Sequence, residues 1–157
     1  MKILILAIGK TDESFLEVGI EKYLKRINRY TKTEFKTLPD PPNRKSLTPE
    51  LQKKAEQELI LACLDKADDL ILLDENGTQF NSRAFAVWLE RKTHESVKKL
   101  VFVIGGPYGF TDDLKKRASS SISLSAFTFS HQLVRLIFAE QLYRAFTIIK
   151  GEPYHHD

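Results

Sequence analysis

Apolar residues gather in short continuous runs that alternate with longer segments of helical periodicity. The runs at residues 2–8, 69–74 and 99–104 predict strands that are buried on both faces of a sheet. A more polar run at residues 33–38 predicts a strand near an edge, and residues 121–124 predict a short fifth strand. Because these strands alternate with helices, we expect an α/β fold: a mostly parallel sheet with helices on both faces.

Helices are expected between these strands and after the last one. Their predicted ranges are residues 12–30, residues 49–64, a segment from residue 82, residues 111–117 and residues 131–150. Thr11 or Asp12 is expected to cap the first helix, and Thr48 the second. The inward face of the second helix is expected to carry Leu51, Ala55, Leu59 and Ala62. Asn76-Gly77 is a strong turn dipeptide and is expected to close the third strand.

The last helix differs from the others because apolar side chains surround nearly its whole circumference. They are Leu133, Val134, Leu136, Ile137, Phe138, Ala139, Leu142, Tyr143, Ala145, Phe146, Ile148 and Ile149. A helix of this kind needs cover on more than one side. Either other helices of the same chain enclose it, or it forms the interface of a homodimer. The frequency of two-fold dimers favours the homodimer.

Composition excludes several classes of protein. The 157 residues include 42% hydrophobic and 29% charged residues, which excludes a disordered chain and a membrane bundle. One cysteine, Cys63, excludes a disulfide framework and a multi-cysteine zinc site. Residues 1–157 show no interdomain linker and are expected to form one domain. The opening apolar run is too short for a signal peptide, so a cytoplasmic location is expected.

The formal net charge is +3, and the excess lies at the end of the chain. From residue 115 onward there are six basic residues (Lys115, Lys116, Arg117, Arg135, Arg144, Lys150) and three acidic residues (Glu140, Glu152, Asp157). An ordinary solvated surface explains this excess, and so does a surface for an anionic partner.

Two features carry candidate chemistry. A glycine-rich turn, Gly105 to Phe110, follows the fourth predicted strand directly. Open α/β sheets bind ligands at this edge, although a tight strand-to-helix turn would have the same composition. His131 and Arg135 share one face at the start of the last helix, where an anion would be attracted. The alternative for Arg135 is a carboxylate partner within the fold.

Four motifs together are specific. They are Ile-Gly-Gly-Pro-x-Gly at 104–109, Leu-Ser-x-x-Thr-x-x-His at 124–131, Glu-x-x-Tyr-Arg-Ala at 140–145 and Pro-Tyr-His at 153–155. With these motifs the chain resembles, over essentially its whole length, the RlmH family of bacterial 23S rRNA pseudouridine N3-methyltransferases, within the SPOUT superfamily. Ser130 departs from the proline expected there, and it is expected to loosen the loop or to cap the last helix.

The resemblance implies a deep trefoil knot near the C-terminus, S-adenosyl-L-methionine as methyl donor and a homodimer. It implies large-subunit rRNA within the ribosome as the substrate, and neither a metal nor a membrane. By motif position, the donor site is expected to include Leu73, Gly105, Leu124, Ser125, Ala126, Phe127, Thr128 and Phe129. A chain of this length leaves no room for a separate RNA-binding domain, so we expect recognition through the dimer surface and the assembled ribosome.

The chemistry of the reaction suggests the catalytic candidates. N3 of a uracil-type ring carries a proton and needs a base, or a positive group that stabilises the anionic ring. His131, Tyr154 and His155 are the titratable candidates, with Arg135 to hold phosphate or developing charge; a structural role is the alternative for His131. The tail is expected to act in its own or the partner's site. Two other functions stay open: methylation of another RNA such as tRNA, and a non-enzymatic nucleotide- or RNA-binding module.

Overall fold

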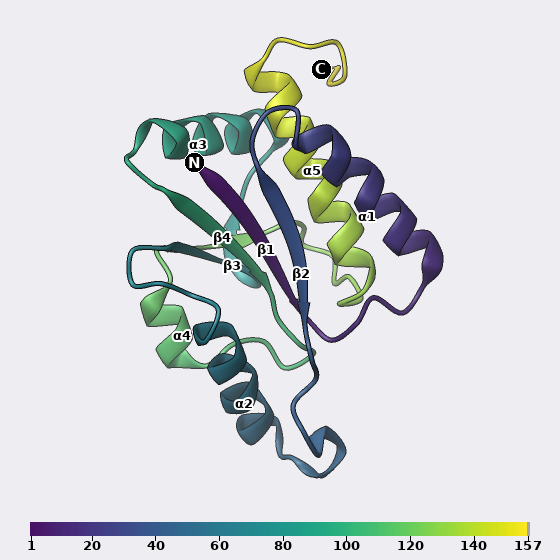
Figure 1. Ribbon diagram of the computed structural model, residues 1–157, viewed down its shortest axis with the longest axis vertical. Coiled ribbons are helices and arrows are strands. Elements are labelled where there is room, and N and C mark those ends of the chain that lie inside the picture. The colour runs from purple at the N-terminus through teal and green to yellow at the C-terminus, as the bar shows by residue number, and fades with distance from the viewer. Residues whose placement is uncertain (157) are drawn as a thin grey trace.

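Five parallel strands form one sheet in the computed structural model, which describes residues 1–156 (Figure 1). The strands are β1 (Lys2–Ile8), β2 (Thr33–Leu38), β3 (Asp69–Gln79), β4 (Lys99–Ile104) and β5 (Ser120–Ser123). Their order across the sheet is β2-β1-β4-β3-β5, and every pairing is parallel. The predicted α/β class is confirmed, and β2 lies at an edge as its polar composition indicated.

Helices cover both faces of the sheet (Figure 1). One face carries α1 (Ser14–Ile27), α3 (Ser82–His94) and α5 (Leu133–Ile149), and the other carries α2 (Pro49–Leu61) and α4 (Asp112–Arg117). A short 3-10 helix spans Arg44–Ser46. Alternate residues of the strands point to opposite faces, so Ile3 and Ile5 of β1 join the α1/α3/α5 core, whereas Leu6 and Ile8 join the α2/α4 core.

The last helix packs between α1 and α3. Gly19 of α1 permits close contact, since a Cβ there would lie 2.8 Å from Cδ1 of Leu136. Enclosure by the chain's own helices therefore explains part of the apolar circumference. The outer side of α5 stays partly exposed, with 40% of Leu133 accessible.

The predicted inward face of α2 is correct at Leu59, which packs against the core, and wrong at Leu51 and Ala62, which are exposed. Leu51 is 52% exposed, whereas Gln52, Glu56 and Ile60 are the buried residues of this helix. Polar residues can occupy the inward face because they satisfy each other: Nε2 of Gln52 donates to Oε1 of Glu56 at 2.9 Å. Thr48 caps α2 as predicted, accepting from the main-chain N–H of Leu51.

The predicted cap of α1 is also wrong. The helix begins at Ser14 and has no side-chain cap, because Thr11 and Asp12 contact the start of α5 instead. The hydroxyl of Thr11 accepts from Nη1 of Arg135 at 3.1 Å, and the main-chain N–H of Asp12 donates to Gln132 at 2.9 Å. These bonds join the end of β1 to the beginning of the last helix.

Strand β3 is longer than predicted. Leu73 and Thr78 both pair with Ile122 of β5, so residues 74–77 form a bulge within the strand. A Cβ at Gly77 would lie 2.6 Å from the main-chain nitrogen of Ile122. Asn76-Gly77 therefore provides the bulge and the close approach to β5, and does not end the strand.

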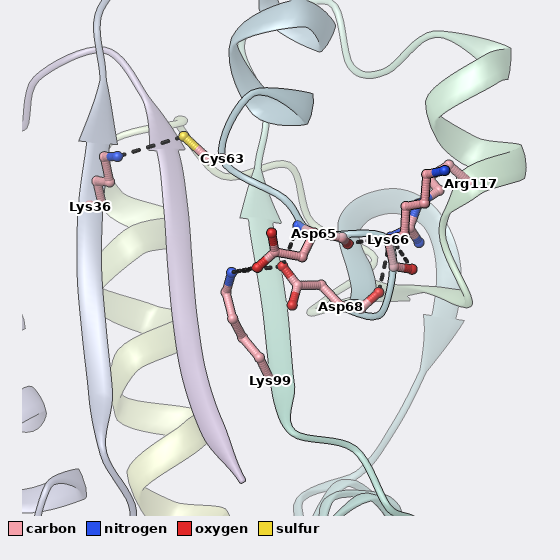
Figure 2. A network of polar contacts seen from close by, with 7 residues as sticks. All are labelled: Lys36, Cys63, Asp65, Lys66, Asp68, Lys99 and Arg117. Atoms are coloured by element: carbon pink, nitrogen blue, oxygen red, sulfur yellow. Dashed lines mark hydrogen bonds and ion pairs between the residues drawn. The ribbon is translucent and has the colours of Figure 1, made fainter.

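Polar contacts join the loop before β3 to neighbouring parts of the chain, near the end of the sheet at which β3 and β4 begin (Figure 2). Nζ of Lys99 lies 2.7 Å from the buried carboxylate of Asp68, and Arg117 donates to main-chain carbonyls of the same loop. Sγ of Cys63 lies 3.6 Å from Nζ of Lys36. Across residues 1–156, no helix has both the length and the apolar character to cross a membrane.

Candidate functional site

One cleft of about 560 Å³ opens at the carboxyl ends of β3, β4 and β5. This is the edge at which open α/β sheets bind ligands, and the volume suits a small organic molecule. The cleft lies between the turn that follows β4 and the loop that joins β5 to α5. It extends to the start of α5, where Val134 and His131 contribute to its wall.

The structure brings together nearly all the residues predicted to bind the methyl donor. Seven of the eight line the cleft: Leu73, Gly105, Leu124, Ser125, Phe127, Thr128 and Phe129. Ala126 is not part of the lining. They meet because β3, β4 and β5 are neighbours in the sheet, although the chain separates Leu73 from Leu124 by fifty-one positions.

Short-range hydrogen bonds shape the loop between β5 and α5. The hydroxyl of Ser125 accepts from the main-chain N–H of Phe127 at 3.0 Å, and Ser123 donates to the carbonyl of Ser125 at 3.0 Å. Ser130, the serine that departs from the expected proline, accepts from the main-chain N–H of Leu133 at 3.1 Å, although the N-cap position of α5 is Gln132, whose side chain does not cap the helix. Phe127 is 83% exposed at the cleft edge.

The glycine turn after β4 is packed closely on its inner side. A Cβ at Gly105 would lie 2.8 Å from the ring of Phe110, which is itself buried. Gly109 adopts φ = 77°, in the region that favours glycine, and its N–H donates to the carbonyl of Gly106 at 3.3 Å. These glycines give the turn a shape that other residues would strain.

An ion pair that motif reasoning did not single out stands in the cleft. Oδ2 of Asp74, in the bulge of β3, lies 3.0 Å from Nζ of Lys115 on α4. Burial alone raises the pKa of Asp74, but the N–H of Asn76 and the Lys115 ammonium outweigh it and hold the pKa below its ordinary value. The sequence contains one signal for this ion pair: Asp74 directly follows the apolar residues that end at Leu73.

Arg135 does not reach the cleft. Its side chain is 1% exposed, and its guanidinium donates to the carbonyls of Ile8 at 2.7 Å, Gly9 at 2.9 Å and His131 at 3.0 Å. The predicted role on phosphate or on a developing charge is therefore not supported within the chain, and the predicted carboxylate partner is absent from these bonds. Arg135 instead ties the end of β1 to the start of α5, and His131 alone of the pair lines the cleft.

Tyr154 and His155 follow the last turn of α5, and their side chains contact residues from the middle of this helix. The hydroxyl of Tyr154 donates to Oε1 of Glu140 at 3.0 Å, and the same oxygen accepts from Arg144 at 2.5 Å. Nη1 of Arg144 lies 3.3 Å from Nδ1 of His155. Because arginine only donates, Nδ1 of His155 is the acceptor in this contact.

Aromatic rings enclose this tail cluster, which consists of Glu140, Arg144, Tyr154 and His155. The ring of Tyr143 lies 4.8 Å from that of Tyr154, and the Arg144 guanidinium lies 4.9 Å from the Tyr154 ring centre. Burial and the hydrogen bonds with Tyr23 and Glu140 raise the pKa of Tyr154 above its ordinary value. The phenol thus stays protonated at neutral pH and acts as a hydrogen-bond donor.

The tail cluster lies against the middle of α5, whereas the cleft lies at the start of this helix. Val134 of the cleft wall and Glu140 of the tail cluster are six residues apart, which is roughly 9 Å at 1.5 Å per residue. Four of the six basic residues at the end of the chain are engaged internally: Lys115, Arg117, Arg135 and Arg144. No group of three or more potential metal ligands occurs within residues 1–156.

A family model described as "Predicted SPOUT methyltransferase" matches residues 1–155. The chain belongs to the SPOUT methyltransferase family. As a member of this family, the chain is a methyltransferase. Its α/β sheet, with a cleft at the carboxyl edge, is consistent with SPOUT architecture.

Curated relatives extend along the whole SPOUT chain. It is 52% identical over 156 residues to the protein named ribosomal RNA large subunit methyltransferase H in Christiangramia forsetii, with 99% of each chain aligned. The protein of that name in Flavobacterium johnsoniae is 53% identical over 156 residues, with 99% of each chain aligned. The one in Parabacteroides distasonis is 50% identical over 157 residues, with 100% of each chain aligned.

A solved structure shows the same fold at low sequence identity. It is a probable methylase family protein from Haemophilus influenzae Rd KW20, with a TM-score of 0.55 and 13% identity. The match covers 99% of this SPOUT chain and 70% of that chain. At this identity, the likeness concerns the arrangement of helices and strands only.

Proposed function

We propose that this protein methylates N3 of a pseudouridine in 23S rRNA of the large ribosomal subunit, with S-adenosyl-L-methionine as donor. The observation that carries the proposal is a sequence identity of 50–53%, over nearly the full length, to proteins named ribosomal RNA large subunit methyltransferase H. The cleft adds support, because seven motif residues from separate parts of the chain line it together. The expected cytoplasmic location belongs to the same proposal.

The residues of the cleft suit this donor. Apolar side chains of Leu73 and Leu124 offer a surface for an adenine ring, and the main chain at Gly105 permits close approach of polar groups. The donor, when bound, supplies a methyl group from a positively charged sulfonium. Because the transfer is a direct displacement, the main task of the cleft residues is to hold the two reactants in line.

The acceptor ring needs a base to remove its N3 proton and positive charge to stabilise the anion that results. His131 lines the cleft of its own chain and is our candidate base there. Tyr154 is held as a protonated donor, so a hydrogen bond to a ring oxygen suits it better than proton removal. His155 and the Arg144 guanidinium complete a cluster that could stabilise the anionic ring.

We propose that the tail acts in the partner's cleft of a homodimer. Within one chain, the Tyr154 hydroxyl is held at Glu140, roughly 9 Å along α5 from Val134 of the cleft wall, and neither Tyr154 nor His155 lines that cleft. An antiparallel two-fold pairing of α5 helices would place each tail near the partner's cleft. The partly exposed outer side of α5 supports this pairing, since Leu133 is 40% exposed beside the cleft.

The deep trefoil knot is part of the proposal. Between α4 and α5 the chain passes from one face of the sheet to the other, because Leu114 belongs to one core and Phe138 to the other. Gly77 of β3 lies against the backbone of β5 along this passage. Membership of the SPOUT family carries this part of the proposal.

Mass mapping of rRNA from a strain that lacks the protein tests the proposed function. One methylated pseudouridine in 23S rRNA should lose its methyl group and regain it when the gene is restored. Loss of a methyl group from tRNA would favour the alternative substrate. Calorimetry with S-adenosyl-L-methionine and its demethylated product addresses the binding module, which has no reason to prefer either compound.

A further inference from the structure

Glu56 is a buried carboxylate outside the lining of the cleft. It lies on the inward face of α2 and is only 3% exposed. Gln52, one turn earlier and 4% exposed, donates from Nε2 to Oε1 of Glu56 at 2.9 Å. Burying a carboxylate costs free energy unless hydrogen bonds or opposite charges offset it, so the partners of Glu56 explain its position.

The carboxylate lies directly behind the glycine turn of the cleft. A Cβ on Gly106 would lie 2.4 Å from Oε1 of Glu56 and 2.8 Å from Oε2, so the carboxylate occupies the space of a side chain at that position. The main chain of Gly106 also donates a hydrogen bond to Glu56. Gly106 lines the cleft with its other side.

Helix α2 also holds the far end of the same turn. Gln57, the next residue along the helix, accepts a hydrogen bond from the hydroxyl of Thr111, the N-cap of α4. Between these two points, the ring of Phe110 packs against Gly105. The turn from Gly105 to Thr111 is thus braced at both ends by neighbouring residues of one helix.

We infer that Glu56 is a positioning residue for the donor cleft: its carboxylate fixes the main chain of Gly106 and so sets the wall against which the methyl donor would bind. The inference rests on the proposed function for the identity of the donor. Glu56 itself touches neither reactant. Its effect on the reaction passes through the backbone of the glycine turn.

Charges around Glu56 are balanced. Asp40 raises the pKa of Glu56 and Arg44 lowers it, and these two residues form their own ion pair at 2.8 Å. Burial is the largest influence and raises the pKa, whereas the hydrogen bonds from Gln52 and Gly106 lower it. The bonds to Gln52 and Gly106 both require an acceptor, which the carboxylate provides on either oxygen.

The variant Glu56→Leu tests the inference with a side chain of similar size that has no acceptor. The N–H of Gly106 then loses its partner on α2. We expect the dissociation constant for S-adenosyl-L-methionine, measured by calorimetry, to rise about tenfold, in keeping with the loss of a hydrogen bond to a charged group. Glu58→Leu, on the exposed side of the same helix, is the matched control and should bind as the wild type does.

The conservative variant separates positioning from general damage. In Glu56→Gln, the amide oxygen accepts from Gly106 and the amide N–H donates to the oxygen of Gln52, whose own amide can flip. Donor affinity should return to within about threefold of the wild type. Wild-type affinity in Glu56→Leu, or a Glu56→Gln variant that folds and binds no better than Glu56→Leu, would overturn the inference.

Amide exchange in the wild-type protein tests the same contact whether or not the variants fold. The N–H of Gly106 should be protected, and exchange at the rate of an unstructured amide would overturn the inference. Absence of donor binding by the wild type, with Gly106 protected, would instead count against the proposed function alone.

Discussion

Two buried charges hold the turns around the cleft, one on each face of the sheet. Arg135 lies in the helical layer of α5 and binds main-chain carbonyls at the end of β1. Glu56 lies in the layer of α2 and binds Gly106 after β4. In both cases the side chain bonds to the backbone of a turn at the carboxyl edge of the sheet. Buried charge at these two places gives a fixed shape to an edge made mainly of loops.

Replacing Glu56 should change how stability depends on pH. Burial raises the pKa of Glu56 in the folded state above its ordinary value of 4.5. At pH values between the ordinary pKa and the raised pKa, the folded state therefore binds a proton more tightly than the unfolded state does. The contribution of Glu56 to stability therefore falls as pH rises through this interval. The neutral amide of Glu56→Gln lacks this dependence.

The measurement is urea unfolding of the wild type and Glu56→Gln between pH 4.5 and pH 7.5. We expect the free energy of unfolding of the variant, relative to the wild type, to be more favourable at neutral pH than near pH 4.5. A difference that stays constant over this range, or changes in the opposite sense, would contradict the assignment of a raised pKa.

At the scale of elements, the strands follow their apolar runs closely, and β1, β2 and β4 have the predicted bounds. The cap at Thr48 was also predictable, because its side chain serves the helix that follows. The errors arose where a polar residue serves a distant segment. Gln52 and Glu56 face inward for the sake of Gly106, and Thr11 binds Arg135 in place of capping α1. No local pattern encodes such contacts.

The bulge in β3 gives a prediction at this scale. Gly77→Ala would place a Cβ 2.6 Å from the main chain of Ile122, and a backbone cannot yield as a flexible side chain does. We expect the free energy of unfolding to fall by about 1–3 kcal/mol, the usual cost of overpacking. Donor affinity should fall as well, because β5 leads into the loop of the cleft.

Chemical denaturation and calorimetry check both effects. Gly151→Ala provides a comparison at a glycine with open space around it, although its positive φ of 66° adds some strain. Equal stability of Gly77→Ala and the wild type would show that the contact between the bulge and β5 is looser than described.

At the scale of the whole molecule, seven of the eight residues that the resemblance assigns to the donor site line one cleft, since their motifs lie at strand ends that parallel order brings together. The place of the tail was not predictable, because the motif at 153–155 carries no information about which cleft it serves. The basic excess was misleading for a similar reason. Four of its six side chains bind other parts of the chain, so the net charge of the segment overstates its free positive surface.

Mixed dimers test whether the tail serves the partner. One chain carries Tyr154→Phe/His155→Ala with an intact cleft, and the other carries Gly105→Ala, whose Cβ would lie 2.8 Å from the ring of Phe110, with an intact tail. Each variant alone should be inactive. If the tail acts across the interface, the mixed dimer regains one complete site and about half of the wild-type activity.

The readout is methyl transfer by doubly tagged, co-purified mixed dimers. Tm values of both parent variants near that of the wild type serve as the folding control. An inactive mixed dimer of two folded chains would place the tail in its own chain's site, contrary to the arrangement proposed here.

The central claim is that this chain transfers a methyl group from S-adenosyl-L-methionine to large-subunit rRNA. The most direct measurement supplies labelled donor to the purified protein with ribosomes from a strain that lacks it, and maps the label. We expect about one methyl group per ribosome, on N3 of a single pseudouridine of 23S rRNA. Label that is absent from rRNA, or that accumulates in tRNA in place of 23S rRNA, would contradict the account.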